Sequence, residues 1–142
     1  MKQSKRVKAF KNRLMNYEFN LSRVEALQTL IDICYSHLPG AMHGLDPSRI
    51  PVSSVPNKEL EYRIRNEIDH HEANLRHTED EIREVDEILN RMETTLKHAV
   101  IYVYAKGKTM ESIAATMHLS TNALQYRINK ELERVLDEKE EI

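Results

Sequence analysis

The stretch that decides the fold is residues 106–130, KGKTMESIAATMHLSTNALQYRINK, where two short breaks divide an otherwise helical pattern. At the first break, Gly107 can adopt a positive φ and end the preceding helix, and Thr109 can then cap the next one. That helix is predicted over residues 110–117. Because it has only two turns, it must pack against neighbouring helices to be stable.

The second break is His118, Leu119 and Ser120, and Ser120 is a suitable N-cap for a final helix that starts at Thr121. Ala114, His118 and Leu124 stand at relative positions five, nine and fifteen of a helix-turn-helix unit. These positions require a small residue, a left-handed turn residue and a core residue. Glycine is usual at the turn, but histidine is among the residues that tolerate a positive φ. The spacing therefore predicts a helix-turn-helix domain over residues 97–136.

A projection of the last helix at 100° per residue puts Leu124, Ile128, Leu132 and Val135 on a core side. The opposite side carries side chains that suit DNA: amides can donate and accept at base edges, a tyrosine can stack, and cations bind phosphates. A purely structural amphipathic helix is the alternative, but the capped two-turn helix before it favours DNA. The candidate DNA-binding residues are Thr109, Ser120, Thr121, Asn122, Gln125, Tyr126, Arg127, Asn129 and Lys130.

N-terminal to this domain, all four prolines and two of the three glycines fall within residues 39–56. Proline ends helices, so residues 39–57 are predicted to be a connector between two helical segments. Residues 1–38 have apolar residues at spacings of three and four and predict one long helix. Residues 58–96 have apolar residues every seven positions and predict a heptad helix, weakened at His71 and Thr78. The two segments can form a helical hairpin within one chain or a coiled coil with a second copy.

Composition agrees with an all-α chain. With 142 residues, 3 Gly and 4 Pro, the chain is too small for a large multi-domain enzyme and too poor in turn residues for an all-β fold. The net charge of −2 hides a segregation: residues 1–38 carry +4, residues 58–94 carry −6 and residues 97–135 carry +3. Residues 137–142 are predicted to be an acidic, solvated tail. A basic patch on a near-neutral chain is therefore expected.

Other classes of function are disfavoured. The longest apolar run has seven residues, so no membrane span is expected, and the basic N-terminus lacks the apolar stretch of a secretory signal. Cys34 is alone and is expected to be a buried small residue. His70, His71 and His77 lack the i, i+4 pairing of metal ligands, and no phosphate-binding glycine loop is present. We therefore expect neither an enzyme nor a cofactor, and a cytoplasmic location.

Residues 99–130 resemble region four of bacterial sigma factors. Together with Leu38-Pro-Gly, the segment Val52-Ser-Ser-Val-Pro56 and the heptad helix, they make nearly the whole chain similar to the ArpU/RinA-type phage transcriptional regulators. The resemblance implies a regulator that binds double-stranded DNA in the bacterial host and activates late phage genes. Thr121 and Asn122 replace the charged residues with which many sigma-like recognition helices begin, so the operator is not implied.

Two alternatives stay open: a small terminase-like DNA-packaging subunit, and a coiled-coil interaction protein that binds no DNA. A single domain with a net charge of +3 offers few phosphate contacts, so DNA binding by a homodimer or a higher homo-oligomer is expected. A direct contact with host RNA polymerase is the other route to sufficient affinity.

Overall fold

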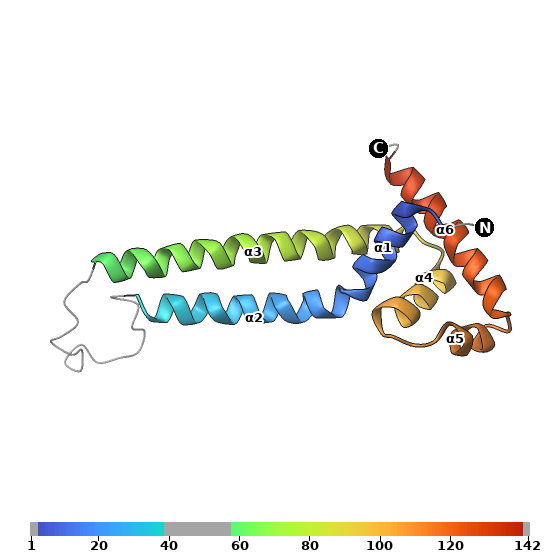
Figure 1. The fold of residues 1–142 in the computed structure, drawn as a ribbon, viewed down its shortest axis with the longest axis horizontal. Helices are drawn as coiled ribbons and strands as arrows, with labels where there is room; N and C mark the ends of the chain where they lie inside the picture. The colour runs from blue at the N-terminus through green and yellow to red at the C-terminus, as the bar shows by residue number, and fades with distance from the viewer. Residues whose placement is uncertain (1–2, 39–57, 141–142) are drawn as a thin grey trace. The chain divides into compact units, whose positions relative to one another are not determined.

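The computed structural model describes residues 3–38 and 58–140, and within these ranges the chain is helical without any strand. This confirms the all-α prediction. The predicted connector, residues 39–57, lies outside the described residues. In chain order the elements are α1 (Lys5–Met15), α2 (Tyr17–Ser36), α3 (Lys58–Asn90), α4 (Thr94–Val100), the π-helix η2 (Ile101–Ala105), α5 (Met110–Thr116) and α6 (Thr121–Glu140) (Figure 1).

The chain divides into two compact units. The first comprises residues 1–21 and 80–142, and the second comprises residues 22–79. No helix of the described ranges is long and apolar enough to cross a membrane.

Residues 1–38 do not form the single helix predicted from their spacing. The helix breaks at Asn16, whose backbone N–H bonds to carbonyls of the preceding turn while its ψ is close to 0°. Asparagine favours helix ends because its side chain competes for backbone hydrogen bonds. The apolar spacing of three and four positions continues across Asn16, from Leu14 to Tyr17 and Leu21. Spacing alone therefore did not reveal the break.

The heptad helix also ends earlier than predicted, at Asn90 instead of residue 96. After a short turn, the carboxylate of Glu93 accepts hydrogen bonds from the N–H groups of Thr95 and Leu96 and so starts α4. The heptad pattern continued through this turn because Leu89, Met92 and Ala99 all face one core. At the other end, α6 continues to Glu140, so the predicted tail of residues 137–142 is helical as far as it is described.

The core of the first unit contains buried residues of α1 as well as of α3, α4, α5 and α6. Val7 and Leu14 of α1 are fully buried together with Leu124, Ile128 and Leu132 of α6. α1 packs against both η2 and α6. The segment predicted as a helix-turn-helix domain, residues 97–136, therefore does not form its core alone, because α1 and the end of α3 contribute to it.

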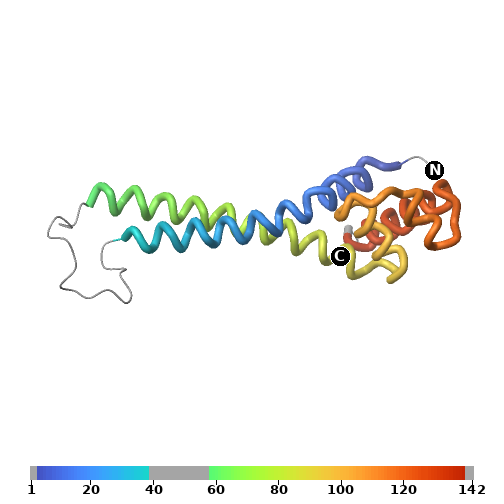
Figure 2. Tube along the Cα trace, turned by 90° about the horizontal axis from the view of Figure 1, so that it is seen from below, coloured from blue at the N-terminus to red at the C-terminus, as the bar shows by residue number. Residues whose placement is uncertain are grey.

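In the second unit, α2 and α3 lie side by side (Figures 1 and 2), and Cys34 and Leu38 pack against Ile68. Cys34 is buried, as expected. Burial and the nearby Glu67 carboxylate raise the pKa of its thiol, so the thiolate is disfavoured. Thr78, expected to weaken the heptad, is 1% exposed and donates its hydroxyl to the carbonyl of Asn74 at 2.8 Å.

Candidate functional site

The turn between α5 and α6 has the backbone conformation that its sequence predicted. His118 in this turn has a φ of 58°, and Gly107 in the preceding turn, between η2 and α5, has a φ of 71°. The amide of Leu119 donates to the carbonyl of Ala114 at 2.9 Å, which closes the turn over a residue that is only 1% exposed. The two helices are therefore held at a fixed angle by a buried small residue and a hydrogen-bonded turn.

Thr109 and Ser120 act as the predicted caps. The hydroxyl oxygen of Thr109 accepts from the amide of Ser112 at 3.1 Å, and that of Ser120 accepts from the amide of Ala123 at 3.1 Å. Both side chains are exposed, and each hydroxyl hydrogen remains available as a donor. Thr121, directly after the second cap, is half-buried.

The structure brings several candidate residues together on the first half of α6. Asn122, Gln125 and Tyr126 are exposed and line one shallow pocket of about 250 Å³ with Asn129. Lys130 follows Asn122 and Tyr126 at spacings of eight and four, so the three share one side of the helix. This group, Asn122, Gln125, Tyr126 and Lys130, is called the α6 surface below.

Asn129 is not a free groove-reading residue, contrary to the prediction. It is 4% exposed, and its side-chain oxygen accepts a hydrogen bond of 2.5 Å from Lys11 Nζ. Lys11 is itself 5% exposed, also donates to Gln3, and lies 5.2 Å from the centre of the Tyr104 ring. Burial lowers the pKa of Lys11 and raises that of Tyr104. Asn129 therefore belongs to the packing of α1 against α6.

Charges on the second half of α6 are neutralised by α1. The guanidinium of Arg6 pairs with Glu133 at 2.8 Å and with Asp137. Hydrogen bonds from Ser4 and Arg6 hold the pKa of the Glu133 carboxyl below its usual range. Arg127 and Lys130 are exposed and have no ion-pair partner within the described ranges. Lys130 of the α6 surface and the adjacent Arg127 therefore remain open to a ligand, whereas the carboxylates of Glu133 and Asp137 are occupied.

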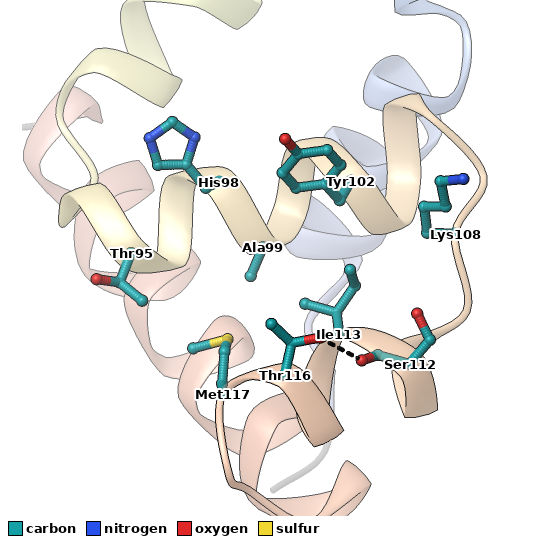
Figure 3. A pocket seen from close by; sticks show the side chains of 9 residues that line it. All are labelled: Thr95, His98, Ala99, Tyr102, Lys108, Ser112, Ile113, Thr116 and Met117. Atoms are coloured by element: carbon teal, nitrogen blue, oxygen red, sulfur yellow. Dashed lines mark hydrogen bonds between the residues drawn. The ribbon is translucent and has the colours of Figure 1, made fainter.

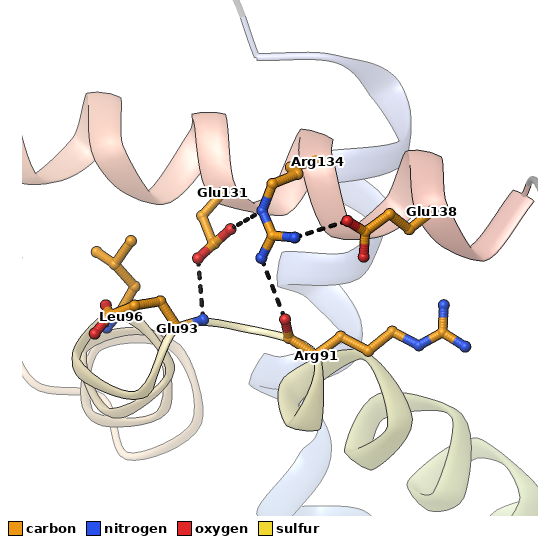
Figure 4. Close-up of polar contacts among 6 residues, drawn as sticks. All are labelled: Arg91, Glu93, Leu96, Glu131, Arg134 and Glu138. Carbon is orange, nitrogen blue, oxygen red and sulfur yellow. Dashed lines mark hydrogen bonds and ion pairs between the residues drawn. The ribbon is translucent and has the colours of Figure 1, made fainter.

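A second set of polar contacts holds α6 to the turn before α4 (Figure 4). Glu131 accepts from the backbone amide of Glu93 at 3.0 Å and pairs with Arg134 at 2.5 Å. Arg134 also donates to the carbonyl of Arg91 at 3.2 Å and pairs with Glu138. The recognition-helix candidate is thus fixed on two sides, by α1 and by the α3–α4 turn.

A pocket outside the α6 surface was not predicted from the sequence. It has a volume of about 590 Å³ and lies between α4–η2 and α5 (Figure 3). Its apolar lining is Ala99, Ile113 and Met117, and its polar lining includes His98, Tyr102 and Lys108. The sequence did contain one indication of this pocket: His98 and Tyr102 are four residues apart and therefore share one side of a helix.

Within the described ranges, no group of three or more His, Cys, Asp or Glu residues is placed to hold a metal ion. Comparison of the chain with family models, curated proteins and solved structures finds no match.

Proposed function

We propose that this chain is a sequence-specific regulator that binds double-stranded DNA, in which the first half of α6 enters the major groove. In the form that the sigma-like resemblance suggests, it activates late genes of a phage or prophage in the cytoplasm of the bacterial host. The observation that carries the proposal is the α6 surface. Asn122, Gln125 and Tyr126 stand exposed together on a helix whose opposite side is fully buried.

The chemistry of this surface suits base reading. The amides of Asn122 and Gln125 can each offer one donor and one acceptor to a base edge, and a major groove accommodates one α-helix. Because α6 is held by both α1 and the α3–α4 turn, these side chains would meet the groove without a large ordering cost.

Electrostatics support specific contacts more than general attraction. The first unit has 15 basic and 14 acidic residues, so long-range attraction to DNA is weak. Locally, Arg6 neutralises Glu133 and Asp137, which would otherwise repel phosphates beside Lys130. Arg127, Lys130 and the exposed Lys108 are the cations best placed to contact the backbone of DNA.

The proposal is tested by selecting bound duplexes from a random library with the full chain, then measuring affinity for the selected sequence. Asn122→Ala and Gln125→Ala should each cost about 1–3 kcal/mol, or roughly 5- to 150-fold, and relax one base position. Asn66→Ala and Gln28→Ala are the matched controls, because both residues are exposed in the second unit. Neither control should change affinity.

Lys130→Ala should weaken binding to all sequences alike and reduce the salt slope by about 1. If Asn122→Ala and Gln125→Ala leave sequence selection intact, the α6 surface does not read DNA. If the selected sequence occurs at a packaging site of the phage genome instead of at a promoter, the terminase-like alternative is favoured. Failure to select any sequence would favour an interaction protein that binds no DNA.

Footprinting of the complex separates two routes to affinity. A two-fold dimer should protect half-sites about 10 base pairs apart or at a multiple of that spacing. A monomer bound at full affinity to one half-site would instead favour a mode in which host RNA polymerase supplies the remaining contacts.

A further inference from the structure

The second unit carries an apolar stripe on α2 that faces away from its own core. The stripe consists of Ala26, Leu30 and Ile33, which are all exposed; Leu30 is 42% and Ile33 is 47% accessible. Each stripe residue directly precedes a buried one, namely Leu27, Ile31 and Cys34. The stripe is therefore rotated by about 100° from the core-facing side of the same helix.

The stripe has the spacing of a coiled-coil seam. Its residues are separated by four and then three positions, and the same alternation reaches Arg23 on one side and His37 on the other. Thr29 and Ser36 flank it, and their hydroxyls already donate to the carbonyls of Glu25 and Ile33. The flanks are therefore small and present no unpaired hydroxyl donor, which allows another helix to approach closely.

Two side chains of opposite charge, Arg23 and Glu67, lie near opposite ends of the stripe. Arg23 is exposed and has no ion-pair partner in the part of the chain that the structure describes. Near the other end, the exposed Glu67 of α3 accepts from the thiol of Cys34 at 3.7 Å and has no other partner among the described residues. Since Cys34 follows Ile33, this carboxylate lies level with the end of the stripe that is distant from Arg23.

We propose that the stripe binds the same stripe of a second copy of this chain, with the two α2 helices antiparallel. If Leu30 packs against Ala26 of the other copy, Arg23 of each copy comes level with Ile33 and Cys34 of the other, within reach of Glu67. The ion pair then forms twice, as an isologous interface requires. A parallel pairing would place the two Arg23 side chains together and leave both Glu67 carboxylates unpaired.

The helical part of α2 in the second unit, residues 22–36, is about 22 Å long, which is short for a permanent dimer. We therefore expect a reversible dimer whose population rises with protein concentration. This inference does not rest on the proposed DNA binding, because the association is measured without DNA.

The first test is analytical ultracentrifugation of the full chain. The wild type should approach twice the chain mass of 16.7 kDa as concentration rises. Leu30→Glu should remain monomeric, because it places two carboxylates in the seam. Gln28→Glu is the matched control: Gln28 is exposed on the same helix but outside the stripe, and this variant should dimerise like the wild type. Circular dichroism should give the same helix content for all three proteins.

The second test examines the antiparallel register. Arg23→Glu and Glu67→Arg should each weaken the dimer by roughly 2- to 30-fold, and the combined exchange should restore it, because each pair is exposed and occurs twice. A dimer strengthened by Arg23→Ala, which removes the two like charges that a parallel pairing would bring together, would indicate parallel helices and overturn the proposal. So would a wild type that stays monomeric at the highest concentration, or a Leu30→Glu variant that still dimerises. A dimer with these properties that selects no DNA would contradict the proposed function alone.

Discussion

The contact between Lys11 and Asn129 allows a sharp test of how α1 is joined to α6. Asn129→Ala removes the side-chain oxygen that lies 2.5 Å from Lys11 Nζ, while leaving the exposed α6 surface unaltered. Lys11 would keep Gln3 as a hydrogen-bond acceptor, at 2.6 Å, and its position near the Tyr104 ring. The ammonium group would remain buried with one strong acceptor fewer.

The expected loss of stability is about 2 kcal/mol. A hydrogen bond to a charged group contributes about 1.5–3 kcal/mol, and Lys11 is only 5% exposed, so water cannot readily replace the lost oxygen. Lys11→Met should cost about 1–3 kcal/mol, because it leaves the buried amide of Asn129 without its donor. The combination of Lys11→Met with Asn129→Leu should return to within about 1 kcal/mol of the wild type, since no unpaired polar group remains.

The pH dependence gives an independent check. Burial lowers the pKa of Lys11 in the folded chain from its usual 10.5. Between the lowered value and 10.5 the unfolded chain binds more protons, so stability rises with pH in this window. The wild type should therefore gain stability relative to Lys11→Met as the pH approaches 10.5 from below.

Urea unfolding followed by circular dichroism measures the free energy of unfolding of these variants at each pH, with Asn66→Ala as the control. A loss below about 0.5 kcal/mol for Asn129→Ala would contradict the buried hydrogen bond. If the loss for Lys11→Met combined with Asn129→Leu equals the sum of the losses for Lys11→Met and Asn129→Leu measured singly, Lys11 and Asn129 are not coupled.

Three further changes test other parts of the first unit. Glu131→Ala should destabilise the chain by about 1–3 kcal/mol in urea unfolding, because it removes the acceptor of the Glu93 amide and the partner of Arg134. His118→Val should cost about 1–2 kcal/mol in the same assay, whereas His118→Gly should be tolerated, since the φ of 58° is strained for a β-branched residue. Tyr17 donates to Asp86 at 2.7 Å, and burial together with that contact raises its pKa to about 12. Ultraviolet titration should detect one tyrosine that ionises near pH 12 and is absent in Tyr17→Phe. The folded chain should lose stability between pH 10 and 12, because only the unfolded state releases this proton there.

Local rules predicted the turn chemistry of residues 106–124 correctly. The positive φ values of Gly107 and His118, the caps at Thr109 and Ser120, and the burial of Ala114 and Leu124 depend on a few neighbouring residues. These features follow from backbone sterics and from unpaired amides at helix starts, which a short sequence determines.

Packing between distant segments could not be predicted in the same way. Lysine is almost never fully buried without a partner, so the sequence around Lys11 suggests a side chain that faces solvent. Its partner, Asn129, is 118 residues away in the sequence, and no local pattern connects the two. The helical projection placed Asn129 on the DNA side because it shows only which residues share a side, and not which other helix covers them. The burial of Asn129 followed from the docking of α1, for which the sequence has no local signal.

The missed helix boundaries have a different cause. Glu93 starts α4, although glutamate is not among the residues preferred as N-caps, and Asn16 interrupts a pattern whose apolar spacing continues. At Glu93 the apolar residues on the two sides face one core, and at Asn16 the apolar spacing continues although α1 and the end of α2 contribute to different cores. Periodicity therefore predicts one helix where two occur.

The docking of α1 against α6 also constrains how the chain can fold during its synthesis. Arg6 and Glu133 are 127 residues apart, and at a translation rate of about 5–20 residues per second α1 waits roughly 6–25 s for α6 to be made. Throughout that time Phe10 and Leu14 have no α6 to pack against, so they are available to chaperones or to other nascent chains. The core that supports the α6 surface can therefore close only late in synthesis, and a fragment that starts at residue 97 would lack one side of it.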